Sequence, residues 1–248
     1  MIKLKTMAEI DAMRDASRIV KDTLDLLETK IAVGMTTKEL DIIAHDYIKS
    51  VGAYPSCLGY CGYPASTCIS VDNMVVHGIP SDNIYIKEGQ IVSVDLTAYY
   101  NGFHGDAART FAIGKISPEK EKLIRVTKEC FFKAMEVVQE GVPIGTIGSV
   151  IQKHAEQNGF SAVRKLVGHG IGREMHEDPN VPNFGIRGTG VRLKKGMVIC
   201  IEPMINAGTY QVDFLSDGWS VVTKDGKPSA HYENTVAITE DGAEILTL

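Results

Sequence analysis

The sequence predicts an α+β fold in which one domain, residues 1–248, consists of two related halves at about 1–114 and 115–248. The main observation is an internal repeat: KEGQIVSVD, which ends at Asp95, resembles KKGMVICIE, which ends at Glu202, 107 residues later. The same offset aligns four further pairs: Gly34 with Gly141, Leu40 with Ile147, Gly52 with Gly159, and Gly89 with Gly196. A chain of this length can bury a large core as one domain. We therefore expect a duplicated unit of two helices followed by strands.

Two helices are expected at the start of the first half. The Thr-x-x-Glu pattern at Thr6 is a capping box, and apolar residues then recur at helical spacing, which predicts a helix over residues 6–29. The same pattern at Thr36 predicts a second helix that ends near Gly52, because glycine commonly terminates helices.

The second half repeats this plan. Ser117 is a suitable N-cap and Pro118 a suitable first helical residue, so we expect a helix from there to a break at Gly141, with Val138 on its apolar side. A shorter helix should follow and run toward Gly159.

Four apolar segments are predicted to form strands: 91–98, 106–113, 197–202 and 234–239. Most of these runs are too apolar to face water, so helices should cover the sheet on at least one side. No segment rich in Gly, Pro or Ser separates the halves, which favours one domain over two.

Four acidic residues belong to two matching pairs. The motif HGD at 104–106 corresponds to HYE at 231–233, so each half carries one acid at a strand end and another on a second strand. A single pair of this kind is equally well explained by solvated strand-end carboxylates. Because the pairing recurs, we expect the four acids to converge, and their repulsion would then require bound cations. These acids are Asp95, Asp106, Glu202 and Glu233.

Histidines supply further candidates. His169 lies in GHGIGREMH, where the glycines let the backbone approach a bound group closely, and this favours a ligand role. His176, in the same motif, is interpreted as either a second ligand or a substrate contact. His77, in VVHGIP, is a third site candidate.

Four other histidines receive different interpretations. His104 and His231 each precede a proposed ligand by two residues, so they share its strand face and are predicted to hydrogen-bond the ligands. His45 and His154 fall in predicted helices and are interpreted as surface residues.

The donor set is rich in oxygen. Four carboxylates with one imidazole suit two adjacent divalent ions such as Mn, Fe or Co, and a water between such ions would be a good nucleophile near neutral pH. Phosphate-loop, dinucleotide, nucleophile-elbow and HExxH motifs do not occur. The cysteines at 57, 61 and 68 are irregularly spaced, which makes a structural zinc site a weak alternative.

Composition bounds the cellular context. The net charge of −5 argues against a nucleic-acid-binding surface. The N-terminal residues lack the apolar core of a signal peptide, and no segment suggests a membrane span. Five cysteines, an odd number, suit free thiols in a reducing compartment. A cytoplasmic protein is therefore expected.

At this level of detail the chain resembles type I methionine aminopeptidases of the pita-bread superfamily. The five candidate ligands occur in order, within or beside VVHGIP, HGDAARTF, GHGIGREMHEDP and IEPM, and the resemblance covers essentially the whole chain. It implies a pita-bread fold, with two pseudo-symmetric halves around a mainly antiparallel curved sheet. It also implies an enzyme that removes the initiator methionine when the second residue is small.

The resemblance assigns a role to each ligand. Asp106 and Glu233 would bridge two ions, Asp95 would chelate one of them, and His169 with Glu202 would bind the other. Glu202 would also be the proton shuttle, taking a proton from a water that bridges the ions and delivering it to the leaving amine.

The resemblance also implies the substrate contacts. His77 and His176 would hydrogen-bond the scissile peptide, with His176 stabilising the charge that develops on the carbonyl oxygen. Cys61 stands where relatives often carry His, and Met175 where they often carry Phe, which puts the shape of the pocket in doubt. The remaining residues implied to bind the methionine side chain are Cys57, Tyr60, Tyr63, Cys68 and Trp219.

The implied cofactors are two divalent metal ions per chain, Co, Fe, Mn or similar. A monovalent cation is a further candidate, because Asp72 and Ser229 match part of such a site in relatives. The implied partners are N-terminal methionyl peptides and nascent polypeptides. The protein is expected to be a monomer, and contact with the ribosome stays open. Nucleic acid and membrane are not expected as partners.

Two alternatives remain. A proline-specific peptidase of the same superfamily would keep the five ligands but usually carries a large extra N-terminal domain. A catalytically inactive relative that serves as a binding module would lack one or more ligands, and here all five are present.

Overall fold

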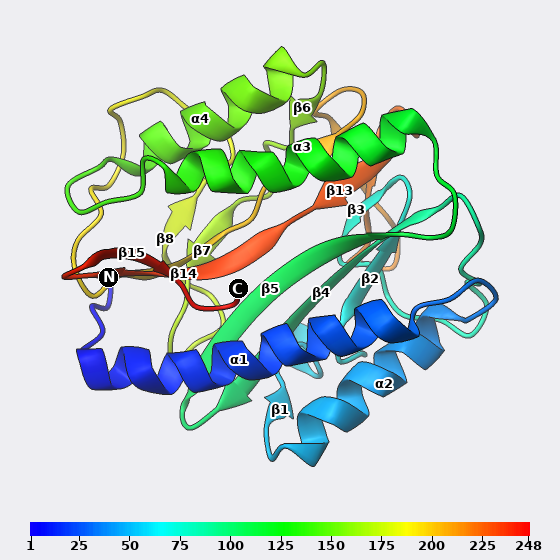
Figure 1. The fold of residues 1–248 in the computed structure, drawn as a ribbon, viewed down its shortest axis with the longest axis horizontal. Coiled ribbons are helices and arrows are strands. Elements are labelled where there is room, and N and C mark those ends of the chain that lie inside the picture. The colour runs from blue at the N-terminus through cyan, green and yellow to red at the C-terminus, as the bar shows by residue number, and fades with distance from the viewer.

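The computed structural model describes residues 1–248 and confirms the α+β prediction. Its four long helices form two pairs, and Figure 1 shows one pair on each side of the central strands β5 and β14. The first pair is α1 (Met7–Lys30) and α2 (Thr37–Ser50), and the second is α3 (Pro118–Met135) and α4 (Ile144–Gln157).

The predicted helix starts are confirmed in atomic detail. The backbone N–H of Thr6 donates to Glu9 Oε2 at 2.9 Å, and that of Thr36 donates to Glu39 Oε2 at 2.7 Å, which completes two capping boxes. Ser117 caps α3 as expected.

The predicted end of α3 at Gly141 is wrong. The helix ends at Met135, because the next amides bond three residues back instead of four: Val137 N donates to Ala134 O and Val138 N to Met135 O. Val138 is nevertheless buried, so this apolar residue packs in the core although it lies beyond the end of the helix.

The strands form one large and two small antiparallel sheets. The large sheet has the order β1-β4-β5-β14-β9-β7-β8, with β2 also paired to β4 and β15 to β14. Its strands are β1 (Tyr54–Pro55), β2 (Cys68–Val71), β4 (Ile91–Tyr100), β5 (Phe103–Ala112), β7 (Gly168–Gly170), β8 (Glu177–Val181), β9 (Val198–Ile201), β14 (Glu233–Thr239) and β15 (Gly242–Ile245). One small sheet comprises β13 (Ser229–His231), β10 (Met204–Asn206) and β6 (Ser161–Ala162), and the other β11 (Val212–Phe214), β12 (Val221–Thr223) and β3 (Met74–Val76). A short 3-10 helix, η1, spans Tyr60–Gly62.

A two-residue turn fixes the register of β4 against β5. Asn101 and Gly102 both have positive φ, 50° and 86°, as a tight Asn-Gly hairpin turn requires. Asp106 therefore lies opposite Thr97, while Asp95 lies opposite Ala108. The two acids are therefore diagonal neighbours on one face of the sheet.

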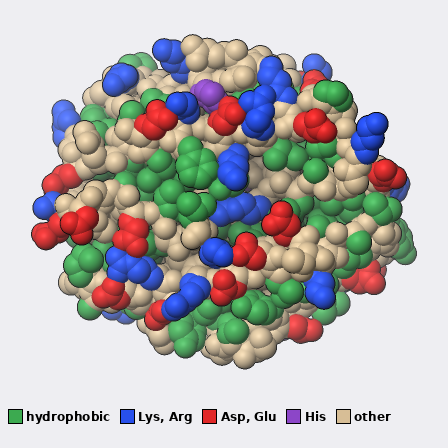
Figure 2. All heavy atoms as spheres, in the orientation of Figure 1, with side chains coloured by type: hydrophobic (Ala, Val, Ile, Leu, Met, Phe, Trp, Pro, Cys, Tyr) green, Lys and Arg blue, Asp and Glu red, His purple; other side chains and the backbone are tan.

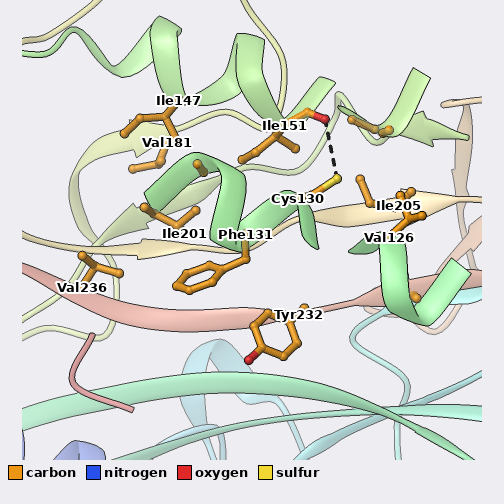
Figure 3. Close-up of a cluster of buried hydrophobic side chains, with 14 of the residues drawn as sticks. Val126, Cys130, Phe131, Ile147, Ile151, Val181, Ile201, Ile205, Tyr232 and Val236 are labelled. Carbon is orange, nitrogen blue, oxygen red and sulfur yellow. Dashed lines mark hydrogen bonds between the residues drawn. The ribbon is translucent and has the colours of Figure 1, made fainter. Parts of the chain in front are cut away.

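Each helix pair covers its own apolar core. One cluster of 16 buried residues includes Leu24 and Leu40 from α1 and α2 and Val94 from β4. A cluster of 25 includes Phe131 from α3 and Ile151 from α4. Figure 3 shows this second cluster, where the Cys130 thiol also donates to the Ile151 carbonyl at 3.6 Å. The two cores flank the central strands. The face of the sheet that they do not cover is available for a site.

Close packing of α1 on β5 depends on Gly105. A Cβ atom at this position would lie 2.6 Å from the backbone N and Cα of Ser17 in α1. We predict that Gly105→Ala lowers the free energy of unfolding by about 1–3 kcal/mol, because the helix must move away from the sheet. Urea denaturation measures this loss. Ala112→Ser, at the exposed end of the same strand, is the control and should change stability by less than about 0.5 kcal/mol.

The surface mixes both signs of charge. On the face drawn in Figure 2, acidic and basic side chains are interspersed, without a block of one sign. None of the helices is both long enough and apolar enough to cross a membrane.

Candidate active site

Five strands that are neighbours in the large sheet each bring one side chain to a single cluster. In sheet order these are Asp95 on β4, Asp106 on β5, Glu233 on β14, Glu202 directly after β9, and His169 on β7. The acids of the first half thus lie on adjacent strands, and so do those of the second half. The contact between β5 and β14 brings the two pairs together.

Distances within the cluster exceed hydrogen-bonding range. His169 Nε2 lies 3.8 Å from Asp106 Oδ2 and 3.7 Å from Glu202 Oε1. His231 Nε2 lies 3.6 Å from Glu202 Oε2 and 3.8 Å from Glu233 Oε2. Atoms that bind one ion are about 3–4 Å apart, because bonds to the ion are about 2.0–2.2 Å long. The spacing therefore suits shared cations better than direct hydrogen bonds.

Several buried atoms of the cluster have no protein partner. Asp106 Oδ1, Glu233 Oε1 and His231 Nε2 are all shielded from solvent and accept or donate no hydrogen bond. A buried polar atom without a partner costs roughly 1–3 kcal/mol. Three such atoms in one place fit a site whose partners are metal ions.

The carboxyl groups respond strongly to this environment. Burial raises the pKa of Glu202 to about 8. Burial also raises the pKa of Asp95 to about 6, with a further upward contribution from Glu202 that is opposed by His231. The pKa values of Asp106 and Glu233 lie well above their ordinary range, first through burial and then through the neighbouring acids. Without cations the cluster holds protons, and metal binding must displace them.

The imidazoles of the site are neutral near pH 7. Burial lowers the pKa of His169 to about 3 and those of His77, His176 and His231 to about 4. Their contacts with carboxylates are therefore not ion pairs. His169 Nδ1 lies 2.9 Å from the Gly170 carbonyl oxygen, to which it must donate, so the Nε2 lone pair faces the acids and is free to bind a metal.

The cluster opens into a cavity of about 310 Å³. Its apolar side is formed by sulfur and aromatic groups: Cys57 and Cys68 are buried, and Tyr63 meets Trp219 edge to face at 5.0 Å between ring centroids. Cys61 is exposed in η1 and does not line the cavity. All predicted site residues line it: Cys57, Tyr60, Tyr63, Cys68, His77, Asp95, Asp106, His169, Met175, His176, Glu202, Trp219 and Glu233.

His176 and His77 both line the cavity, although they are far apart in the sequence. Tyr60 Oη lies 2.8 Å from His176 Nδ1, and burial raises the pKa of Tyr60, so this phenol stays protonated and can donate to that nitrogen. His176 then carries its proton on Nε2, which makes it a hydrogen-bond donor. His77 has φ of 58°, a strained backbone conformation for a residue with a side chain. Strain of this kind is common at functional sites.

The predictions that His104 and His231 hydrogen-bond the proposed ligands are wrong. His104 does not bond a ligand; its Nδ1 lies 3.1 Å from the Gly172 carbonyl oxygen instead. His45 and His154 are partly exposed, which agrees with their interpretation as surface residues, and they pair with Ser66 Oγ and with Glu129 Oε2. His231 points into the acidic cluster, but its Nε2 lies 3.6 Å or more from the carboxylates and makes no hydrogen bond with them.

The two residues considered for a monovalent cation already have protein partners. Asp72 Oδ1 accepts from Lys120 Nζ at 2.5 Å and from the Ile91 amide at 3.1 Å. The Ser229 hydroxyl contacts Asn206 Oδ1 at 2.8 Å. A cation binding through these side chains would have to compete with the lysine.

Sequence reasoning missed two supporting residues. Thr97, buried on β4, lines the cavity and lies directly opposite Asp106 in the register of β4 and β5. Its signal was available, since it follows Asp95 by two residues and so shares its strand face. Asn183, fully buried, donates from Nδ2 to the Glu202 carbonyl oxygen at 2.9 Å and fixes the backbone of that residue. Nothing in the local sequence around Asn183 indicates this contact.

Comparison with known proteins decides the family. The model of metallopeptidase family M24 matches residues 11–240. The chain belongs to this family. It is similar to methionine aminopeptidase from Clostridium perfringens, with 56% identity over 248 residues that cover 100% of this chain and 99% of the relative. It is similar in structure to methionine aminopeptidase from Rickettsia prowazekii, with a TM-score of 0.98, 41% identity and full coverage of both chains.

More distant M24 structures share the fold alone. The prolidase from Pyrococcus horikoshii OT3 has a TM-score of 0.78 at 23% identity, covering 99% of this chain and 63% of that one. Together these likenesses confirm the pita-bread fold and the resemblance to methionine aminopeptidases.

Membership of M24 implies a divalent metal, and the donor atoms fit one. Two groups of side chains could each hold an ion, because one ligand atom from every member lies within 4.8 Å of the others. The groups are Asp106, His169, Cys200 and Glu233, and Asp95, His231 and Glu233. Glu233 belongs to both, as a bridging residue would.

Proposed function

We propose that this protein removes the initiator methionine from nascent proteins and peptides whose second residue is small. The observation that carries the proposal is the cavity, which joins a cage of four acids to a pocket of thiols and aromatic rings. Sulfur and aromatic faces pack favourably against a thioether. The names of the similar proteins from Clostridium perfringens and Rickettsia prowazekii support the same activity.

Two divalent ions are proposed as the cofactor. Asp95, Asp106, His169, Glu202 and Glu233 would hold them, as the resemblance implies, and Glu233 belongs to both of the side-chain groups that could bind an ion. When bound, the ions would supply Lewis acidity, which lowers the pKa of a water molecule and binds the substrate's α-amino group. Binding of that amino group would restrict cleavage to the N-terminus. Co, Fe and Mn all suit the donor set.

Glu202 is proposed as general base and then general acid. Its carboxyl group lines the cavity, and metal binding would displace the proton that burial keeps on it in the metal-free site, which leaves a carboxylate that can accept a proton. Its backbone is fixed by Asn183, so the carboxylate has a defined position at the edge of the cage. It would accept a proton from the attacking water and deliver it to the nitrogen that leaves.

His176 is proposed to stabilise the carbonyl oxygen of the scissile bond. With Nδ1 occupied by the Tyr60 hydroxyl, His176 presents Nε2–H to the cavity. A fixed donor at the position where negative charge develops lowers the barrier more than one that must reorient. His77, which also lines the cavity, would form a hydrogen bond with the scissile peptide group as well.

The proposal predicts a specific pattern of substrates. Metal-loaded protein should hydrolyse Met-Ala-Ser and leave Met-Lys and Ala-Pro peptides intact, as mass spectrometry of the products can show. Cleavage of Ala-Pro would favour the proline-specific alternative. Metal binding without cleavage of any peptide would favour the inactive binding module.

Loss of the His176 side chain should impair chemistry and spare metal binding. We predict that His176→Ala lowers kcat by about 100-fold or more, because one oxyanion donor is worth that much. Metal content, measured by elemental analysis after dialysis, should stay at the wild-type level.

Tyr60→Phe is the matched control for this variant. It keeps the imidazole but removes the hydroxyl that fixes its tautomer, so its loss of kcat should be smaller and in the same direction. A His176→Ala protein that loses metal would show that His176 is a ligand and contradict the assigned role.

A further inference from the structure

His231 stands in the same relation to the acidic cage as His169. The Nε2 atom of each imidazole faces two carboxylates, at 3.7 and 3.8 Å for His169 and at 3.6 and 3.8 Å for His231. Both residues are buried. Each approaches Glu202 from a different side, through Oε1 and Oε2 respectively. The five-residue ligand set contains the first of these histidines and omits the second.

The backbone of His231 is held firmly in place. Its N–H donates to Thr110 Oγ1 at 2.9 Å, and its carbonyl oxygen accepts from the same hydroxyl at 2.8 Å. It also pairs with Met204 across β13 and β10. The side chain is 1% exposed, and its Nε2 has no hydrogen-bond partner. A buried imidazole whose backbone is fixed and whose unpaired nitrogen faces carboxylates is placed to bind a ligand between that nitrogen and the acids.

The corresponding histidine of the first half lies elsewhere. His104 precedes Asp106 by two residues, as His231 precedes Glu233. Its Nδ1, however, lies against the Gly172 carbonyl oxygen at 3.1 Å, and its ring packs against Tyr99 in a tilted arrangement. The duplication therefore does not by itself bring a histidine into the cage.

We propose that His231 is a sixth ligand of the metal centre and binds, through Nε2, the ion held by Asp95 and Glu233. One atom from each of these three residues lies within 4.8 Å of the other two. The 3.6–3.8 Å separations are too long for hydrogen bonds and match atoms that share an ion. This inference rests on the proposed function only for the presence of the two ions.

A second imidazole changes the metal preference of the site. With carboxylates alone, the ion at Asp95 would be in an environment suited to Mn²⁺, whereas imidazole suits Fe, Co and Zn better. His169 supplies one imidazole to the second ion, and His231 supplies one to the first. Each ion of the pair then has the same mixed donor set.

The test counts imidazole nitrogens at the metal in the whole protein. Protein loaded with one and then two equivalents of Co²⁺ or Mn²⁺ is examined by titration calorimetry and by pulsed EPR, which detects directly bound ¹⁴N. We expect nitrogen couplings from two histidines in the wild type, and from one in either His231→Gln or His169→Gln. His231→Gln should also raise the Kd of one ion by about 10–100-fold, more for Co²⁺ than for Mn²⁺.

His104→Gln is the control, since this histidine has the same place in its motif but lies outside the cage. It should keep both couplings and both affinities. A wild-type spectrum with a single histidine nitrogen that persists in His231→Gln and disappears in His169→Gln would overturn the proposal. A weaker Kd in His231→Gln with unchanged couplings would overturn it as well, because His231 would then only position Glu202. None of these readouts requires peptide hydrolysis, so they separate this inference from the proposed activity.

Discussion

Glu202→Gln is expected to lower kcat on Met-Ala-Ser by at least about 1,000-fold while the fold stays intact. A general base contributes roughly 100- to 10,000-fold, and the amide can neither accept the proton nor serve as an anionic metal ligand. The change is isosteric, and the Asn183 bond goes to the backbone carbonyl of residue 202, so the local structure should persist. Steady-state kinetics with saturating metal, together with circular dichroism, measures both parts.

The matched control is Glu240→Gln, at an exposed glutamate whose contact with Lys195 is 3.8 Å long. This variant should keep full activity. If Glu202→Gln retained activity within tenfold of the wild type at equal metal content, another residue would have to be the proton shuttle. The neutral imidazoles of His77 and His176 would then be the nearest alternatives in the cavity.

The helix starts and the relative positions of Asp95 and Asp106 can be predicted from local sequence. The capping boxes at Thr6 and Thr36 predict two helix starts because their partners lie three residues away. The relation between Asp95 and Asp106 was predictable for the same reason, since a two-residue Asn-Gly turn sets the register of one hairpin. The repeat then predicted a second pair of acids.

Contacts between distant segments were not predictable. His104 and His231 have the same position in their motifs, yet one bonds a carbonyl 68 residues away and the other enters the cage. The bond from Asn183 to Glu202 and the pairing of β5 with β14 likewise depend on how distant segments come together. A periodic pattern specifies which face of a strand a residue occupies, but not which neighbour covers that face.

The second large effect should be a fall in the stability of metal-free protein as pH rises from about 6.5 to 8. The folded pKa of Glu202, about 8, lies above its ordinary value of 4.5, so the folded state keeps a proton that the unfolded chain has released. Stability from such a group is complete at low pH and is lost as pH rises through the folded value. The loss is about 1.4 kcal/mol per pH unit for each group, and Asp106 and Glu233 act in the same direction.

The window must begin near pH 6.5 because the buried histidines act in the opposite direction. The pKa of His169 is lowered to about 3 and that of His231 to about 4, from an ordinary 6.5, so the unfolded chain binds protons that the folded state refuses. Below pH 6.5 this lowers stability and opposes the effect of the acids. At about pH 6.5 half of the unfolded imidazoles still carry a proton, so their opposing contribution fades between about pH 6.5 and 7.5, and the acids dominate the slope above that.

Urea denaturation of chelator-treated protein at several pH values measures how the free energy of unfolding changes with pH. Two further samples, one with metal and one with a substitution, identify the groups responsible. Saturating Mn²⁺ should reverse the trend, because metal binds the deprotonated acids and competition with protons weakens as pH rises. Metal-free Glu202→Gln should show a shallower fall than the wild type, since one titrating group is gone. A metal-free wild type whose stability increases from pH 6.5 to 8 would mean that the acids are already ionised in the fold. They would then have to be separated or solvated in a way that the cage of neighbouring strands does not allow.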